Sequence, residues 1–144
     1  MDQTLINKLD GPIIVFGAGG FIGINLLITL LSSRRDVYGV SQDNRNNLRL
    51  IQNNIPPENT LSADINDYIQ LKEVVQQIKP KTIFNLAAYG SYSKQKEYKK
   101  IYTTNCTSNT TLIELLKEQG FSSYVYAGSS SEYGRNCAAP LRKR

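Results

Sequence analysis

Glycines that directly follow a short apolar run constrain the fold of this chain more than any other sequence feature. The run at residues 12–16 predicts a buried strand, and the apolar stretch at 21–31 predicts a helix. Between them, glycines at positions 17, 20 and 23 would permit a tight turn, close approach of a pyrophosphate to the backbone and close packing of helix on sheet. The amino terminus of the helix would attract the anion. These features predict a dinucleotide-binding turn formed by Gly17, Gly20, Phe21, Ile22 and Gly23.

The spacing of this turn departs from the common dinucleotide fingerprint. The pattern is Gly-x-x-Gly-x-x-Gly, whereas Gly-x-Gly-x-x-Gly would need a glycine at position 22, where the chain has isoleucine. A tight strand-to-helix turn that binds nothing is therefore the alternative. The position of the turn, after the first predicted strand and at the start of the first predicted helix, favours the dinucleotide.

The rest of the chain alternates strand and helix patterns. Further strands are predicted at 37–40, 61–64, 82–88 and 123–127, and further helices near 48–51, from 66 or 67 to 78, and at 98–119. This alternation implies βαβ crossovers and hence an α/β fold with a Rossmann-like, doubly wound parallel sheet. We expect a single NAD(P)-binding domain over residues 1–144, with a sheet that is truncated after about the fifth strand.

Composition excludes several kinds of site and location. The chain has no histidine, which removes His-based triads and most zinc sites, and its two cysteines, Cys106 and Cys137, have no metal-ligand spacing. We therefore expect no metal. Apolar runs stay short of the ~18 residues that a membrane span needs, and the first residues lack a secretory pattern. A cytoplasmic protein without a membrane partner is the expectation.

The basic excess of the chain is local. The net charge of +5 comes from 17 basic and 12 acidic residues, and it gathers in four lysines between 94 and 100 and in the segment 142–144. Tyrosines at 92, 98 and 102 lie near the lysines, so a nucleic-acid surface is an alternative. A solvated helix face and a charged tail explain both groups without such a partner.

With motifs further along, the glycine turn resembles the extended short-chain dehydrogenase/reductase family. The resemblance covers about residues 12–136 and points to the NAD(P)-dependent epimerases and dehydratases, which mostly act on nucleotide-activated sugars. In that family an aspartate and its neighbour after the third strand contact the adenine ring, and Asp64 and Ile65 match them. Ala87 and Ala88 match small residues that let the cofactor lie against the backbone. The resemblance implies NAD or NADP as cofactor.

Two later positions match the region of the family's active site. Asn105 resembles a helix asparagine with a structural role there, and we group it with the cofactor-binding candidates. The segment 129–134, Ser-Ser-Ser-Glu-Tyr-Gly, is similar to the family's Ser-Ser-x-x-x-Tyr-Gly segment. The resemblance places the catalytic Ser/Thr of the family on Ser129, where its hydroxyl would orient a sugar hydroxyl near the nicotinamide. A nucleotide sugar is thus the implied substrate of the complete form.

The end of the second predicted strand departs from the family pattern. Many members have an acid there that hydrogen-bonds the adenosine ribose, which marks NAD preference. This chain has Ser41 at that position and Asp43 two residues later, and Asp43 is our candidate for the ribose contact. Arg45 or Arg49 could instead reach a 2′-phosphate. The choice between NAD and NADP stays open.

The family's catalytic Tyr-x-x-x-Lys pair has no match at its usual place. Tyr133 is followed four residues later by Cys137, and Tyr92 with Lys96 has the spacing but precedes Asn105. We therefore expect a truncated chain that lacks the substrate-binding C-terminal region, and enzymatic activity stays open. The alternatives are a non-catalytic dinucleotide-binding or interaction protein and a non-functional fragment of a damaged gene. A truncated sheet would leave a bare edge, which predicts self-association into a homo-oligomer.

Overall fold

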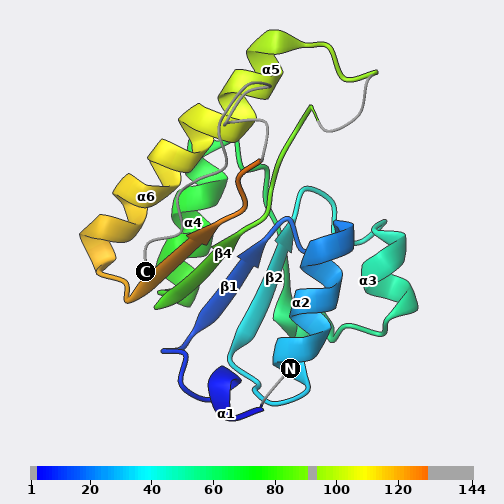
Figure 1. The fold of residues 1–144 in the computed structure, drawn as a ribbon, viewed down its shortest axis with the longest axis vertical. Helices are drawn as coiled ribbons and strands as arrows, with labels where there is room; N and C mark the ends of the chain where they lie inside the picture. The colour runs from blue at the N-terminus through cyan, green and yellow to red at the C-terminus, as the bar shows by residue number, and fades with distance from the viewer. Residues whose placement is uncertain (1–2, 91–93, 130–144) are drawn as a thin grey trace, which may run out of the picture.

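The computed structural model, which describes residues 3–90 and 94–129, contains the predicted parallel sheet. Its five strands lie in the order β3-β2-β1-β4-β5 (Figure 1). They are β1 (Ile13–Phe16), β2 (Val37–Ser41), β3 (Thr60–Ser62), β4 (Thr82–Asn85) and β5 (Ser123–Tyr126). The chain leaves β1 toward β2 on one side and later returns to pair β4 on the other side, so β1 marks the point where the strand order reverses. The Rossmann-like α/β fold is confirmed.

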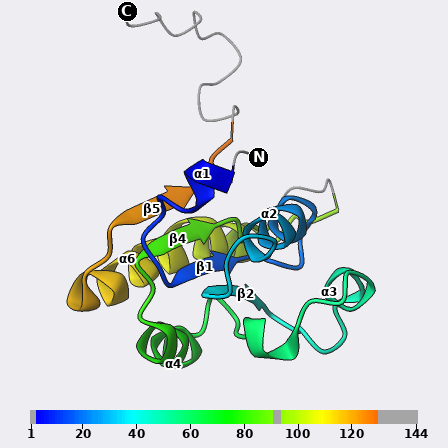
Figure 2. The same cartoon turned by 90° about the horizontal axis from the view of Figure 1, so that it is seen from below.

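The helices cover both faces of this sheet (Figure 2). They are α1 (Gln3–Ile6), α2 (Phe21–Leu31), α3 (Leu48–Gln52), α4 (Tyr68–Ile78), α5 (Tyr98–Tyr102) and α6 (Ser108–Gln119), with short 3-10 and π-helical turns at η1 (Pro57–Asn59) and η2 (Thr103–Thr107). The helices α1 and α2 lie on one face, and α4 and α6 lie on the other. In the described segments, no helix combines the length and the apolar character needed to cross a membrane.

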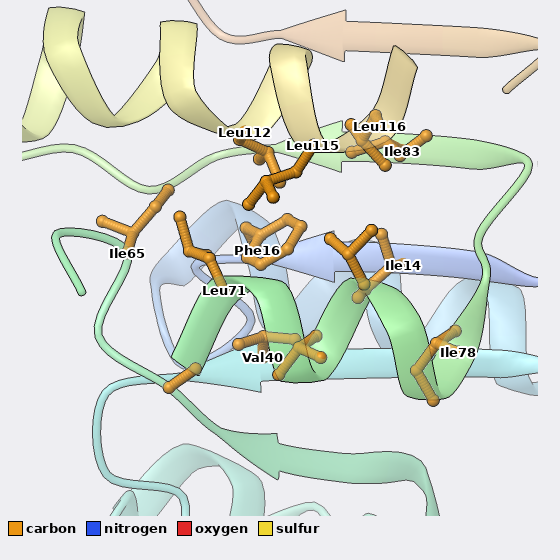
Figure 3. Packing of buried hydrophobic residues seen from close by; sticks show 13 residues of the cluster. Ile14, Phe16, Val40, Ile65, Leu71, Ile78, Ile83, Leu112, Leu115 and Leu116 are labelled. Atoms are coloured by element: carbon orange, nitrogen blue, oxygen red, sulfur yellow. The ribbon is translucent and has the colours of Figure 1, made fainter. Parts of the chain in front are cut away.

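Two apolar clusters hold these layers together, because the central strands are buried on both faces. On the face covered by α4 and α6, Phe16 of β1, Leu71 of α4 and Leu112 of α6 point toward one another (Figure 3). On the opposite face, Val15 packs with Leu27 of α2. All four residues of β1 are buried, as is typical of the central strand of a parallel sheet.

Three strands end before their predicted limits, β3 and β4 by two or more residues and β5 by one. β4 ends at Asn85, whose Oδ1 accepts a hydrogen bond from the backbone N–H of Ala87 at 3.2 Å. β3 ends at Ser62, and the Oδ1 of Asp64 accepts one from the N–H of Asn66 at 2.9 Å. Such local bonds compete with the strand ladder. They leave the residues after β3 and β4 in loops at the carboxyl edge of the sheet.

The predicted helix at 98–119 has an interruption. It consists of α5 and α6 joined by the π-helical turn η2. α6 buries an apolar stripe, whereas α5 has no buried residue. The helix α1 was not predicted, because a four-residue helix gives no periodic signal and its formation depends on the burial of Ile6 against the sheet.

The bare edge expected of this sheet is present in the part of the chain that the structure describes. β5 is an outer strand, and its Val125 and Tyr126 are exposed. An exposed outer strand is a template for pairing with another chain. Self-association stays a prediction.

An ion pair ties the amino-terminal segment to the start of β2. The guanidinium of Arg34 bonds both carboxylate oxygens of Asp36, at 2.8 Å and 2.6 Å, and its Nη1 also donates to the carbonyl oxygen of Leu9. The hydrogen bond from Arg34 holds the pKa of Asp36 below its ordinary value. A carboxyl with a lowered pKa stabilises the folded state above its unfolded pKa, and this stabilisation disappears as the pH falls through the folded value.

We expect Asp36→Asn to lower the free energy of unfolding by about 1 kcal/mol or less at pH 7, since the pair is partly exposed. The difference from the unsubstituted chain should shrink as the pH falls below about 4, where Asp36 of the unfolded chain becomes protonated. Urea unfolding at pH 7 and pH 3 measures both values, with Glu118→Gln as the control for an exposed carboxylate on α6. An equal loss at both pH values would show that packing, and not charge, stabilises this corner.

Candidate dinucleotide-binding cleft

A cleft of about 460 Å³ lies at the carboxyl edge of the sheet, where the strand order reverses. Its lining comes from the glycine turn after β1, the end of β2 and the segment after it, the loops after β3 and β4, and three residues before and within α5 and η2: Gln95, Lys100 and Thr104. Ligands of doubly wound sheets bind in this crevice. The topology therefore brings together five segments that are far apart in the sequence.

Backbone contacts determine the shape of the glycine turn. Gly17 has a φ of +76°, and a Cβ there would lie 2.8 Å from the backbone N of Ala87. A Cβ on Gly23 would lie 2.2 Å from the carbonyl oxygen of Gly17. Gly20 is the N-cap of α2, and a Cβ on it would have one close neighbour, at 3.2 Å. Gly17 and Gly23 thus serve close backbone packing, whereas Gly20 leaves space in front of the helix amino terminus.

The five predicted residues of this turn divide into two groups. Gly17 and Gly20 line the cleft. Gly23 is buried beneath the turn, and Phe21 and Ile22, which are 74% and 64% exposed, lie outside the lining. Cofactor contact by any of these five residues stays a prediction.

The loop after β3 brings Asp64 and Ile65 to the cleft. Their contact with an adenine ring stays a prediction. The Oδ2 of Asp64 accepts a hydrogen bond from the Nε2 of Gln42 at 2.9 Å, which links this loop to the end of β2. Its Oδ1 accepts bonds from the backbone N–H and side chain of Asn66. Ile65 is buried and packs in the core cluster. The carboxylate and its apolar neighbour therefore form one wall.

The loop after β4 supplies the opposite wall. Ala87 and Ala88 line the cleft, and Tyr89 continues it. Asn105, in the π-helical turn η2, holds this loop by two hydrogen bonds. Its Oδ1 accepts from the N–H of Tyr89 at 2.9 Å, and its Nδ2 donates to the carbonyl oxygen of Tyr89 at 2.7 Å. Asn105 is outside the lining, so the structure gives it a positioning contact with the loop.

The end of β2 places Ser41, which stands at the position of the family's acid, and the acid candidate Asp43 differently. Ser41 lines the cleft, whereas Asp43 is exposed and lies outside the lining. The carboxylate of Asp43 accepts hydrogen bonds from the side chain and the backbone N–H of Asn46, at 2.8 Å and 3.2 Å. These bonds lower the pKa of Asp43. Ribose contact by Asp43 stays a prediction that its present hydrogen bonds do not favour.

Two polar residues that line the cleft, Lys100 and Thr104, were not predicted from the sequence. The Nδ2 of Asn66 donates to the Oγ1 of Thr104 at 3.2 Å. The Nζ of Lys100 lies 4.5 Å from the ring centre of Tyr89. The hydrogen bond between the Tyr89 hydroxyl and Glu97 raises the pKa of that hydroxyl. No motif marks these residues, and the chain between β4 and η2 brings them to the cleft.

Of the remaining residues considered in the sequence analysis, Ser129 lies within the described segments and several others do not. Ser129 follows β5, is exposed, and is outside the lining of the cleft. The catalytic role of Ser129 stays a prediction. Tyr92, Tyr133 and Cys137 lie outside the described residues. Within residues 3–90 and 94–129, no three His, Cys, Asp or Glu side chains gather into a group that could hold a metal ion.

The parallel sheet, its point of strand reversal and the glycine turn define a Rossmann-like fold of the dinucleotide-binding class. Residues 13–144 match the model of the NAD dependent epimerase/dehydratase family, and the chain belongs to this family. The resemblance inferred from the sequence is thereby confirmed.

Individual relatives agree with this assignment. The chain is 25% identical to a UDP-glucose 4-epimerase of Lacticaseibacillus casei, with 91% of this chain and 39% of the relative covered. Protein CapI of Staphylococcus aureus is 27% identical, with 90% and 41% covered. The chain spans about two-fifths of the length of these curated relatives.

Solved structures show the same fold. WbmG of Bordetella bronchiseptica in complex with NAD and UDP superposes with a TM-score of 0.77 at 17% identity, covering 94% of this chain and 43% of that chain. MoeE5 in complex with UDP-glucose and NAD gives a TM-score of 0.67 at 27% identity, covering 86% and 38%. Again the match extends over about two-fifths of the longer chains.

Proposed function

We propose that this chain binds NAD or NADP in the cleft and forms the cofactor-binding part of an enzyme that acts on a nucleotide sugar. The observation that carries the proposal is the meeting of the glycine turn, the end of β2 and the two loops around one cleft at the point of strand reversal. Family membership and the nucleotide-sugar relatives support the same proposal.

The residues present fit a dinucleotide. Gly17 and Gly23 leave no room for a Cβ, while the space in front of Gly20 is open, so a pyrophosphate could approach the amino terminus of α2. Ile65 offers an apolar surface and Asp64 an acceptor for an adenine ring at one wall. Ala88 leaves the opposite wall small. When bound, the nicotinamide supplies transfer of a hydride.

The proposal extends to Ser129 as the residue that orients a sugar hydroxyl. It follows β5 at the same edge of the sheet where the cleft opens, which is where residues acting on a substrate of this fold are expected. A hydroxyl can donate to and accept from the reacting oxygen. The complete reaction, whether epimerisation, dehydration or reduction, also needs a group that exchanges a proton with the sugar.

Fluorescence titration of the folded chain with NADH and NADPH tests the proposal. We expect saturable binding of at least one of them, and we expect Gly20→Val to weaken it by about tenfold or more, since the added side chain would occupy the space meant for the anion. Thr29→Val places the same side chain further along α2, away from the cleft, and should bind like the unsubstituted chain. No binding by a chain with a cooperative melting transition would contradict the proposal.

A further inference from the structure

A second cavity, of about 400 Å³, lies at the opposite edge of the sheet from the dinucleotide cleft. The segments that line it come just before β2 and β3 or begin β2, so it lies at the amino edge. It shares no residue with the cleft. A cavity of this size can enclose a small molecule. Its lining consists of Leu31, Arg34, Arg35, Tyr38, Pro56, Glu58 and Asn59.

Hydrogen bonds hold the walls of this cavity in place. Asn59 is only 9% exposed, and its Nδ2 donates to the carbonyl oxygens of Arg35 at 3.1 Å and Val37 at 2.8 Å. These two bonds join η1 to the start of β2. Arg34 is held by its ion pair with Asp36. The cavity is therefore built from residues that contacts within the fold already position.

Three polar groups of the lining lack a partner in the part of the chain that the structure describes. The Oδ1 of Asn59 accepts no hydrogen bond there, although both hydrogens of the same amide group are used. The guanidinium of Arg35 and the carboxylate of Glu58 form no ion pair within the described residues, and they do not pair with each other. A largely buried polar atom usually has a partner from the protein, water or a ligand. The cavity thus offers one cation and two kinds of oxygen acceptor to a ligand.

The arrangement of charge indicates the class of ligand. Arg35 can bind a carboxylate through two parallel N–H···O bonds. Glu58 and the Oδ1 of Asn59 are acceptors on adjacent residues, and an ammonium group supplies the N–H donors that they need. The carboxyl end of α2, whose last residue Leu31 lines the cavity, also favours a positive charge and disfavours a phosphate. Leu31 and Tyr38 add apolar surface.

We propose that this cavity binds a free α-amino acid with an apolar side chain, its carboxylate on Arg35 and its ammonium group on Glu58 and Asn59. The apolar side chain lies against Leu31 and Tyr38. This site does not depend on the proposed function, because no residue of the dinucleotide cleft takes part in it.

Isothermal calorimetry of the folded chain with L-leucine and L-phenylalanine tests the inference. We expect at least one of them to bind saturably, with a Kd of about 1 mM or lower. For the one that binds, the amine that lacks the carboxylate and the acid that lacks the ammonium group should each bind about tenfold or more weakly. Arg35→Gln and Glu58→Gln should each weaken the amino acid by about tenfold or more, since each removes one charged partner.

Arg45→Gln is the matched control, because it removes an exposed arginine outside the lining and should leave the affinity unchanged. Arg35 and Glu58 are exposed, so their variants should keep the melting temperature of the unsubstituted chain. The absence of saturable binding up to about 10 mM would overturn the inference. Undiminished affinity for the amine analogue, or of the Arg35→Gln variant for the amino acid, would also overturn it. Binding of the amino acid without binding of either dinucleotide would support this inference and contradict only the proposed function.

Discussion

Replacing Gly17 with alanine is expected to lower the free energy of unfolding by about 2–5 kcal/mol and to abolish dinucleotide binding. Two costs add up at this residue. Its φ of +76° strains any side chain by about 1–2 kcal/mol. The new Cβ would also lie 2.8 Å from the N of Ala87 and 2.9 Å from the carbonyl oxygen of Leu86, which adds about 1–3 kcal/mol of overpacking. Because both neighbours are backbone atoms, relief would require moving β1 away from the loop after β4.

Gly120 provides the control for this substitution. It has a nearly equal φ of +74°, but a Cβ there would meet no atom within 4 Å. Gly120→Ala should therefore show the backbone strain alone, of about 1–2 kcal/mol, and should leave dinucleotide affinity unchanged. Urea unfolding and fluorescence titration of both variants measure the difference. Equal effects of the two substitutions on stability and affinity would contradict the close approach at Gly17.

The second large effect is expected for Leu112→Ala in α6. Leu112 is fully buried and faces Phe16 and Leu71 in the cluster that joins α4 and α6 to the sheet (Figure 3). Truncation removes apolar contacts and leaves a cavity, because the strands against which Leu112 packs cannot move in to fill it. We expect a loss of about 3–4 kcal/mol in the free energy of unfolding. Such a loss is a large fraction of the stability of a small domain.

Leu48→Ala makes the same chemical change on the surface. Leu48 begins α3 and is 69% exposed, so its truncation should change the free energy of unfolding by about 0.5 kcal/mol or less. Parallel urea denaturation of the two variants gives the comparison. Similar losses at both positions would mean that α6 does not pack on the sheet as described.

Much of the fold could be predicted because local and periodic signals coincide. α2 begins and ends at the predicted residues, since the glycine turn precedes it and polar residues follow it. α4 begins close to the predicted residue 66 or 67, where Asp67 caps it by accepting from the N–H groups of Ile69 and Gln70. The alternation of elements also predicted the parallel sheet, whereas the order of its strands comes from the structure.

The candidate site was predictable only where a motif marks it. Gly17, Asp64 and Ala87 belong to motifs and do line the cleft. Asp43 was chosen for its charge near a strand end, but the turn after β2 directs its carboxylate to Asn46. Lys100 reaches the cleft through a long crossover. Contacts of that kind depend on tertiary packing, which no local pattern in the sequence encodes.

The π-helical turn η2 lies between α5 and α6 and gives their side chains different rotational positions about the helix axis. One extra residue in a turn rotates the side chains before it by about 100° relative to an unbroken helix. After η2, Leu112 of α6 packs in the core. Within η2, Asn105 accepts a hydrogen bond from the loop after β4. Insertion or deletion of one residue at η2 would rotate the residues that face the cleft, whereas the apolar residues of α6 would keep their packing on the sheet. Changes of one residue at this turn can therefore alter the wall of the cleft formed by the loop after β4, while the core beneath α6 stays packed as it is.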